Sequence, residues 1–198
     1  KWAGGKTQLI DQIKEQLPQN IQNENFTFIE PFVGSGAILF WMLDKFPNIK
    51  NAIINDINLD LINCYKTIKN NVGELIDTLS AWEKEYHAFA EDQDAKKVYY
   101  YAKRTLFNER NSKQVIQSAL FIFLNRTCFN GLYRVNSKNK FNVPIGRSKS
   151  LPKICDQENL LLVSEVLQRT TILNGDYTAT LNHATDNTLF YFDPPINL

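Results

Sequence analysis

Apolar positions in the first part of the chain alternate between short continuous runs and helical stripes. Short apolar runs predict buried strands, and apolar residues three and four positions apart predict the helices that cover them. The pattern first predicts a helix that ends at Pro18 and carries Leu9, Ile10, Ile13 and Leu17 on one face. A strand at 26–29, a turn at 32–36 and a second helix follow; this helix ends near Pro47 and has Ile38, Trp41 and Met42 pointing inward. A strand at 52–54 and a helix at 58–69 come next. This alternation predicts parallel strands joined by crossover helices.

The middle of the chain has a different pattern, in which large apolar side chains recur at helical spacing. The stripes are Leu75, Leu79, Trp82, Tyr86 and Phe89, and then Val115, Ile116, Ala119, Leu120 and Phe123, with Ser112 expected to cap the second helix. We interpret both stripes as helix core rather than as a ligand site, because aromatic side chains at this spacing usually pack inward.

The helical pattern is interrupted between residues 125 and 150. Gly131, Pro144 and Gly146 lie in this segment and favour a loop or an irregular β-hairpin. After Pro152 the pattern predicts a helix carrying Leu160, Leu161, Val163, Val166 and Leu167, followed by strands at 171–173 and 189–192. We therefore predict one α/β domain formed by residues 1–69 and 166–198, into which a mostly helical domain of residues 70–165 is inserted.

Charge is balanced overall but unevenly distributed. Hydrophobic residues make up 43% of the chain and charged residues 22%, with a net charge of +1, so the composition is that of an ordinary globular protein. A segment without Asp or Glu holds the basic residues Arg126, Arg134, Lys138, Lys140, Arg147, Lys149 and Lys153. Such a segment either attracts polyanions or is a solvated loop. The acidic segment 74–94 is expected to face away from any DNA.

Cysteine and histidine spacing predicts neither disulfides nor a metal site. Cys64, Cys128 and Cys155 are far apart and form no C-x-x-C pair, and His87 and His183 have no partner at metal-ligand spacing. The apolar runs are too short to span a membrane, and no signal peptide is recognisable. These features predict a cytoplasmic protein that needs no metal.

The first candidate site combines a glycine turn with an acidic residue. Gly34 and Gly36 follow the strand at 26–29, where a turn without side chains lets the backbone approach a ligand. Asp56 ends the next strand, about 20 residues further on, which is where an acidic side chain binds ribose hydroxyls in nucleotide-type sites. Alone, the turn could serve packing and Asp56 could cap the helix after it; together they favour binding.

Two further motifs carry candidate chemistry. Asp193-Pro194-Pro195 follows the apolar strand at 189–192, and its two prolines hold the backbone extended with the carbonyl groups exposed. Lys1-Trp2-Ala3-Gly4-Gly5-Lys6 places a glycine pair and a lysine ahead of a helix, where an anion or a carboxylate can bind.

Together these motifs resemble the Dam-type DNA adenine-N6 methyltransferases of the D12 class. The matching segments are Lys1 to Lys6 for the opening motif, Phe32-Val33-Gly34-Ser35-Gly36 for the cofactor loop, residues 125–134 and 141–144 for the target-recognition hairpin, and Asp193-Pro194-Pro195 for the start of the D-P-P-Y motif. The resemblance covers essentially the whole chain. It implies a Rossmann-like class I methyltransferase sheet with an inserted, mostly helical target-recognition domain that carries a β-hairpin.

The resemblance also implies an activity and the residues behind it. The activity is transfer of a methyl group from S-adenosylmethionine to N6 of adenine in double-stranded DNA, within GATC, by base flipping and in-line attack without a metal. Cofactor contacts are implied for Trp2, Ala3, Gly4, Gly5, Lys6, Glu30, Pro31, Phe32, Gly34, Ser35, Gly36, Asp56, Ile57, Asp176, Tyr177 and Asp193. Catalysis is implied for Asp193, Pro194 and Pro195, and DNA contacts for Arg126, Phe129, Asn130, Leu132, Tyr133, Arg134, Lys138, Pro144, Arg147 and Lys149.

One departure from the family pattern leaves alternatives open. The family has Tyr or Phe after the two prolines, whereas this chain has Ile196. We expect Ile196-Asn197-Leu198 to belong to a later segment, with a loop and further C-terminal strands missing. If Ile196 is in its true place, a catalytically silent DNA-binding module is the alternative. Gly5-Lys6-Thr7 also matches the end of a P-loop nucleotide triphosphatase motif, and methylation of RNA or protein is a further alternative.

Overall fold

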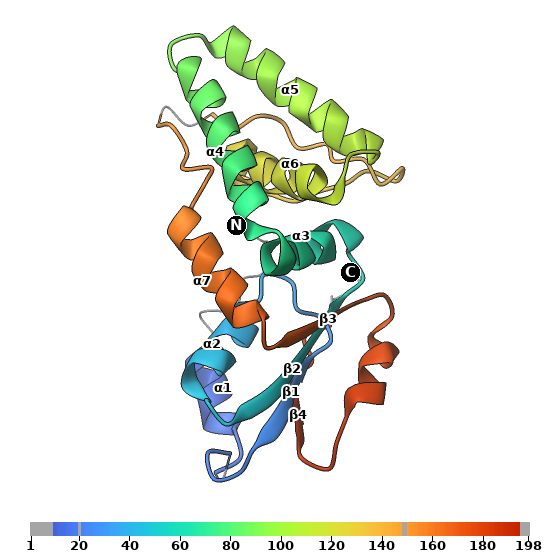
Figure 1. Cartoon of the computed structure of the whole chain (residues 1–198). Helices are drawn as coiled ribbons and strands as arrows, with labels where there is room; N and C mark the ends of the chain where they lie inside the picture. Colours follow the sequence, from blue (N-terminus) through green and yellow to red (C-terminus); the bar gives the residue numbers. More distant parts are fainter. Residues whose placement is uncertain (1–9, 20, 148–149, 195–198) are drawn as a thin grey trace. The chain divides into compact units, whose positions relative to one another are not determined.

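A computed structural model describes residues 10–19, 21–147 and 150–194 (Figure 1). The described chain divides into two compact units, one of residues 63–164 and one of residues 10–62 with 165–194. Each unit is described by itself below. The domain boundaries predicted at residues 70 and 165 stay predictions, because compactness alone does not establish independent folding.

The second unit is built on a parallel sheet. Its strands are β1 (Phe26–Glu30), β2 (Ile49–Asp56), β3 (Thr170–Asn174) and β4 (Thr188–Phe190), in the spatial order β3-β2-β1-β4. All three pairings are parallel, and Ile29 of β1 lies opposite Ile53 of β2 and Phe190 of β4. Every residue of β1 is buried, as expected for a central strand covered on both faces. The prediction of parallel strands with crossover helices is confirmed.

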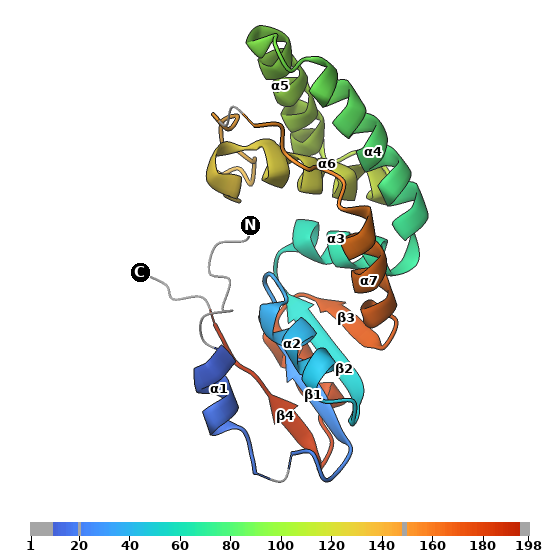
Figure 2. The same ribbon diagram turned by 90° about the vertical axis from the view of Figure 1, so that its left-hand side faces the viewer.

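Two helices pack beside this sheet. Figure 2 shows α2 (Ala37–Lys45) lying across the sheet and α1 (Ile10–Gln16) beside β4. Ile38 and Met42 of α2 are each 1% exposed and Phe28 of β1 is fully buried, so α2 supplies the core on its face. Trp41 was expected to point inward, but it is only partly buried and meets Phe46 edge-on at 5.9 Å between ring centroids.

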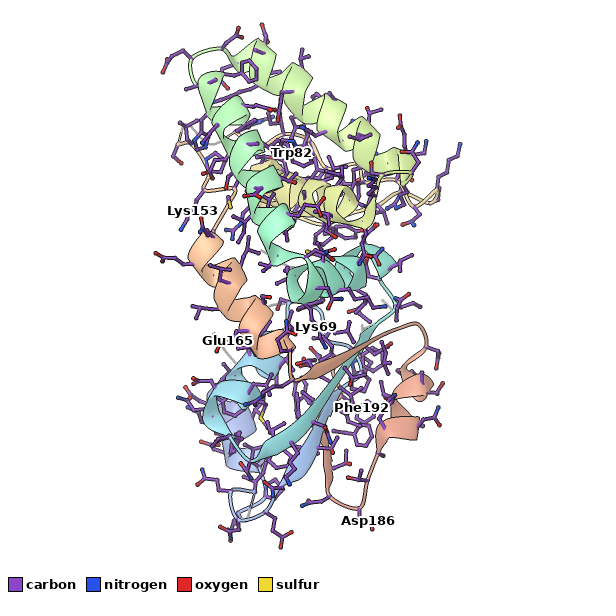
Figure 3. All side chains as sticks on the ribbon, in the orientation of Figure 1. Lys69, Trp82, Lys153, Glu165, Asp186 and Phe192 are labelled. Carbon is purple, nitrogen blue, oxygen red and sulfur yellow. The ribbon has the colours of Figure 1, made fainter. Side chains whose placement is uncertain are left out.

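The other unit is mostly helical, as predicted. It contains α4 (Val72–Ala88), α5 (Gln93–Glu109) and α6 (Gln114–Thr127), and α3 (Leu59–Asn70) and α7 (Gln157–Leu167) each run from one unit into the other. The two predicted stripes contribute to the core: Leu75, Leu79 and Phe123 are fully buried. Tyr100 and Phe107 of α5, which lie outside those stripes, are fully buried as well. Trp82, labelled in Figure 3, lies edge-on to Phe123 at 6.2 Å and beneath the Lys103 ammonium, which is 3.7 Å from its ring centroid.

Several predicted element ends were wrong. β2 begins at Ile49 rather than at Ala52, and β4 ends at Phe190 rather than at Phe192. The N-cap of α6 is Lys113, whose side chain makes no capping hydrogen bond, so Ser112 is not the cap. α6 also continues to Thr127 because Phe123 and Leu124 are buried in the core, where apolar packing outweighs the polar residues that follow.

None of the described helices combines the length and the apolar character that a membrane crossing needs. Among residues 10–19, 21–147 and 150–194, no group of three or more His, Cys, Asp or Glu side chains could hold a metal ion.

Candidate active site

Three acidic residues lie where parallel strands of the sheet end. Glu30 is the last residue of β1, Asp56 is the last residue of β2, and Asp193 follows β4. The backbone N–H of Tyr191 donates to the carbonyl of Ile29 at 2.9 Å, which keeps the segment after β4 alongside the end of β1. The carboxyl ends of parallel strands are where α/β sheets bind ligands.

The turn between β1 and α2 uses its glycines for backbone geometry. Gly34 has φ of 49° and Gly36 has φ of 74°, both in the left-handed region. Gly36 is the N-cap of α2 and donates to the carbonyl of Val33 at 2.8 Å. A residue with a Cβ would be strained at either position, so the sequence pattern G-x-G here reflects a real conformational need.

Asp56, at the end of the neighbouring strand β2, stabilises this turn by a hydrogen bond. Its Oδ2 accepts a hydrogen bond from the backbone N–H of Gly34 at 3.1 Å, and its Oδ1 accepts one from the N–H of Asn58 at 2.8 Å. Each carboxylate oxygen has a second lone pair, so both can still accept from a ligand. The adjacent Ile57 side chain is 80% exposed, and a ligand at Asp56 would meet this apolar surface.

Asn55 is a structural residue that sequence reasoning missed. Its buried amide group donates to the carbonyl of Pro31 at 3.1 Å and to the carbonyl of Gly175 at 3.0 Å. Its own backbone carbonyl accepts from the N–H of Val33 at 2.9 Å. Asn55 therefore ties the turn after β1 to the turn after β3, and only its place at a strand end could have indicated this.

Glu30 is buried and incompletely hydrogen-bonded. The residue is 3% exposed, and its Oε2 has no hydrogen-bond partner. Burial raises the pKa of Glu30 to about 8; a hydrogen bond from the backbone N–H of Leu39 opposes the rise, and the negative charge of Asp193 adds to it. The side chain is therefore mostly protonated at neutral pH.

Aromatic rings gather beside the acidic residues. The ring of Phe32 lies 5.5 Å from that of Tyr177 and 6.4 Å from that of Phe192, and Phe190 and Phe192 stack at 5.3 Å. Phe192, labelled in Figure 3, is 49% exposed. The apolar pattern predicted Phe192 as part of a strand, and its place in this cluster was therefore missed. Such a cluster can take the face of a flat ring.

Asp176 is the N-cap of the short helix η3 (Tyr177–His183). Its carboxylate accepts from the backbone N–H of Thr178 at 2.9 Å and from the hydroxyl of the same residue. These two hydrogen bonds from Thr178 hold the pKa of Asp176 below its usual value. The cap fixes the start of η3 and thereby the position of the Tyr177 ring beside Phe32.

The basic segment of the helical unit folds back on itself without forming regular strands. On either side of η2 (Phe129–Gly131), isolated antiparallel bridges join Cys128 to Ile145 and Val135 to Phe141. The N–H of Asn142 also donates to the carbonyl of Arg134 at 3.1 Å. The prediction of a loop or irregular hairpin is confirmed; residues 128–147 are called the hairpin below.

Helix α5 anchors the hairpin through residues that sequence reasoning missed. Asn108 brackets Phe141, with its Oδ1 accepting from the Phe141 N–H at 2.7 Å and its Nδ2 donating to the Phe141 carbonyl at 3.0 Å. The Tyr100 hydroxyl and Arg104 both donate to the carbonyl of Val143, at 2.9 and 3.2 Å. Arg110 donates to the carbonyl of Asn139 at 2.7 Å. These residues position the hairpin.

Most of the predicted DNA-binding side chains are exposed around the hairpin. The exposed ones are Arg126, Phe129, Asn130, Leu132, Arg134, Lys138, Pro144 and Arg147. Tyr133 differs, because its ring packs against Phe121 and Phe141 at 5.4 and 5.9 Å. Trp2, Ala3, Gly4, Gly5, Lys6, Lys149 and Pro195 lie outside the described residues.

The parallel sheet and its helices have the arrangement of a class I methyltransferase fold. A family model for the D12 class N6 adenine-specific DNA methyltransferases matches residues 2–198. The chain is 48% identical to the Type II methyltransferase M.MjaIII of Methanocaldococcus jannaschii over 98% of its own length and 67% of that protein. It is 38% identical to a DNA adenine methylase of Haemophilus influenzae, over 98% of this chain and 62% of that one.

The chain therefore belongs to the D12 class of N6 adenine-specific DNA methyltransferases. This membership decides against the P-loop nucleotide triphosphatase alternative. The chain spans about two thirds or less of the curated relatives it matches, for example 64% of the Type II methyltransferase M1.LlaDCHI of Lactococcus lactis.

Proposed function

We propose that the protein transfers a methyl group from S-adenosylmethionine to N6 of adenine in double-stranded DNA, within the site GATC. The observation that carries the proposal is the set of acidic strand ends, Glu30, Asp56 and Asp193, beside a glycine turn in a D12-class chain. We propose that it acts on DNA in the cytoplasm and that the reaction uses no metal ion.

The described residues fit the proposed cofactor. S-adenosylmethionine supplies an electrophilic methyl group on a cationic sulfonium. Asp56 retains lone pairs for the ribose hydroxyls, and the partnerless Oε2 of Glu30 is a buried acceptor for a cationic group. The ring cluster of Phe32 and Tyr177 offers a face to the adenine ring of the cofactor.

The remaining cofactor contacts are proposed from the family motif. Trp2, Ala3, Gly4, Gly5 and Lys6 would close the methionine end, and Pro31, Gly34, Ser35 and Gly36 would line the turn. Ile57 would cover one side of the ligand, and Asp176 would accept from the amino group of the cofactor's adenine while Tyr177 meets its ring.

The proposed reaction relies on hydrogen-bond acceptors. The exocyclic amine of adenine is a poor nucleophile because its lone pair is delocalised into the ring. The Asp193 carboxylate accepts from one N–H of this amine and the Pro194 carbonyl accepts from the other, which draws the nitrogen towards tetrahedral geometry and frees the lone pair. We propose that Pro195 limits backbone rotation after Pro194, because its ring fixes φ. Acceleration comes from positioning and fixed dipoles.

Access to the amine requires the adenine to leave the duplex, which costs a few kcal/mol. We propose that Phe129 and Asn130, both exposed at the start of the hairpin, fill the place of the extruded base, with Leu132 and Pro144 against neighbouring bases. Arg134 would hold O6 and N7 of the guanine; its Nε donates to Asn142 at 2.8 Å, which leaves the terminal nitrogens of the guanidinium for the base. Tyr133 would support this hairpin from within.

Methyl transfer with matched DNA substrates tests the proposal. Labelled S-adenosylmethionine is incubated with a GATC duplex and with a duplex of the same composition lacking GATC. We expect label in adenine N6 of the first duplex only, its loss in Asp193→Ala, and no change in Asp186→Ala, which removes an exposed carboxylate elsewhere in the same unit. Cofactor binding without any transfer would support the silent DNA-binding module instead.

A further inference from the structure

We propose that Glu30 holds a proton until a cationic ligand binds and then gives it up, so that cofactor binding is coupled to proton release. The inference rests on the proposed function, because it takes the ligand to be S-adenosylmethionine. It adds a role for Glu30 that the reaction itself does not use.

The geometry around Glu30 disfavours the carboxylate form of its side chain. The residue is 3% exposed at the end of the central strand β1, between the covered faces of the sheet. The Leu39 backbone N–H in the first turn of α2 is a donor to the side chain, whereas Oε2 has no partner. A buried carboxylate with so few donors lacks the hydrogen bonds that would replace its hydration.

The charges around Glu30 act in the same direction. The segment after β4 supplies Asp193, whose carboxylate repels a second negative charge, and Tyr191, whose own pKa is raised by burial and by the charges of Asp193 and Glu30. β2 supplies another carboxylate, Asp56, two residues beyond Ile54, which pairs with Glu30 in the ladder. α2 supplies the Leu39 N–H. Among the described residues, none of these groups is a cation.

A bound cation reverses this balance. The cofactor carries positive charge on its sulfonium and on its ammonium, and either charge beside Oε2 favours the carboxylate form of Glu30. The pKa of Glu30 among the protein's own groups is about 8 and falls when the cation binds, so binding at pH 7 releases a proton. The contribution of Glu30 to affinity then rises with pH, by up to tenfold per unit, between the lowered pKa and about 8, and is constant above that.

Isothermal titration calorimetry of the whole protein tests the coupling directly. S-adenosylmethionine is titrated at pH 7 in buffers of different ionisation enthalpy, and the slope of observed enthalpy against buffer enthalpy gives the protons released. We expect close to one proton, about 0.9 if the pKa falls from about 8 to well below 7. Glu30→Gln, which mimics the protonated side chain, should bind with almost no release, while Glu24→Gln, an exposed acid of the same unit, should release as the wild type does.

Two further arms sharpen the test. Asp193→Asn removes the negative charge that raises the pKa of Glu30. Affinity should therefore stop rising at a lower pH in this variant than in the wild type. This measurement does not depend on whether Glu30→Gln folds. S-adenosylhomocysteine lacks the sulfonium but keeps the ammonium: less release than with the cofactor assigns the coupling to the sulfonium, and equal release assigns it to the ammonium. Binding without proton release in the wild type, or unchanged release in Glu30→Gln, overturns the inference alone; no binding of the cofactor overturns the proposed function as well.

Discussion

Asp56 and Gly34, 22 positions apart in the chain, are joined by a hydrogen bond of 3.1 Å from the backbone N–H of Gly34 to Oδ2 of Asp56. The bond links the end of one strand to the glycine turn that follows its neighbour. One carboxylate thus shapes the turn and remains available to a ligand, so the same substitution should affect both the turn and the binding of the cofactor.

Asp56→Asn should weaken cofactor binding more than it weakens the fold. The amide cannot offer charged acceptors to ribose hydroxyls, and charge-assisted hydrogen bonds contribute about 1.5–3 kcal/mol, so the dissociation constant should rise by about tenfold or more. Calorimetric titration checks the affinity and thermal unfolding checks the fold. Asp186→Asn is the matched control, and an equal loss of affinity there would contradict the assignment of Asp56.

Asn55→Ala should destabilise the sheet unit. The substitution leaves the carbonyls of Pro31 and Gly175 without the amide donor they share, and an unsatisfied buried polar group costs about 1–3 kcal/mol. Denaturant unfolding measures the loss. Asn51→Ala, at an exposed position of the same strand, should change stability by less than about 0.5 kcal/mol; equal effects at the two positions would show that the cross-link is unimportant.

The sequence predicted the strand order along the chain and the acidic strand ends because both are local patterns. The apolar run before Glu30 and the glycines after it indicate a strand and a turn wherever they occur. Element ends were less predictable. Phe192 continues an apolar run, yet β4 ends at Phe190, the last residue of β4 that pairs with β1. The ring of Phe192 stacks on that of Phe190 within the ring cluster.

Residues that act across long separations were not predictable from one sequence. Asn108 holds Phe141 from another element, and Asn55 holds Gly175 after a separation of 120 positions. Neither asparagine belongs to a motif, and asparagine is common in turns for local reasons. Their roles follow only from the tertiary arrangement, which brings a side-chain amide to backbone groups that would otherwise be unpaired.

Asn108→Ala should weaken DNA binding without removing any DNA contact. The substitution frees both backbone groups of Phe141, so the hairpin loses one of its anchors on α5 and the exposed side chains near Phe141 are held less firmly. We expect a several-fold rise in the dissociation constant for a GATC duplex, measured by fluorescence anisotropy, with cofactor affinity unchanged. Thr105→Ala, exposed on the same helix, is the control. Unaltered DNA affinity in Asn108→Ala would show that the hairpin needs no such anchor.

Basic residues of the hairpin should separate into two classes by their salt dependence. Each phosphate contact contributes about 0.9 to the slope of log affinity against log salt, so Lys138→Ala and Arg147→Ala should each flatten the slope by about that amount for any duplex. Arg134→Ala should instead lower the preference for GATC by about 1–3 kcal/mol, because a bidentate contact to guanine carries sequence information. Lys50→Ala removes the same charge from an exposed position of β2 and should leave both the slope and the preference unchanged. A uniform effect of all four substitutions would mean that the hairpin attracts DNA by net charge alone and reads no base.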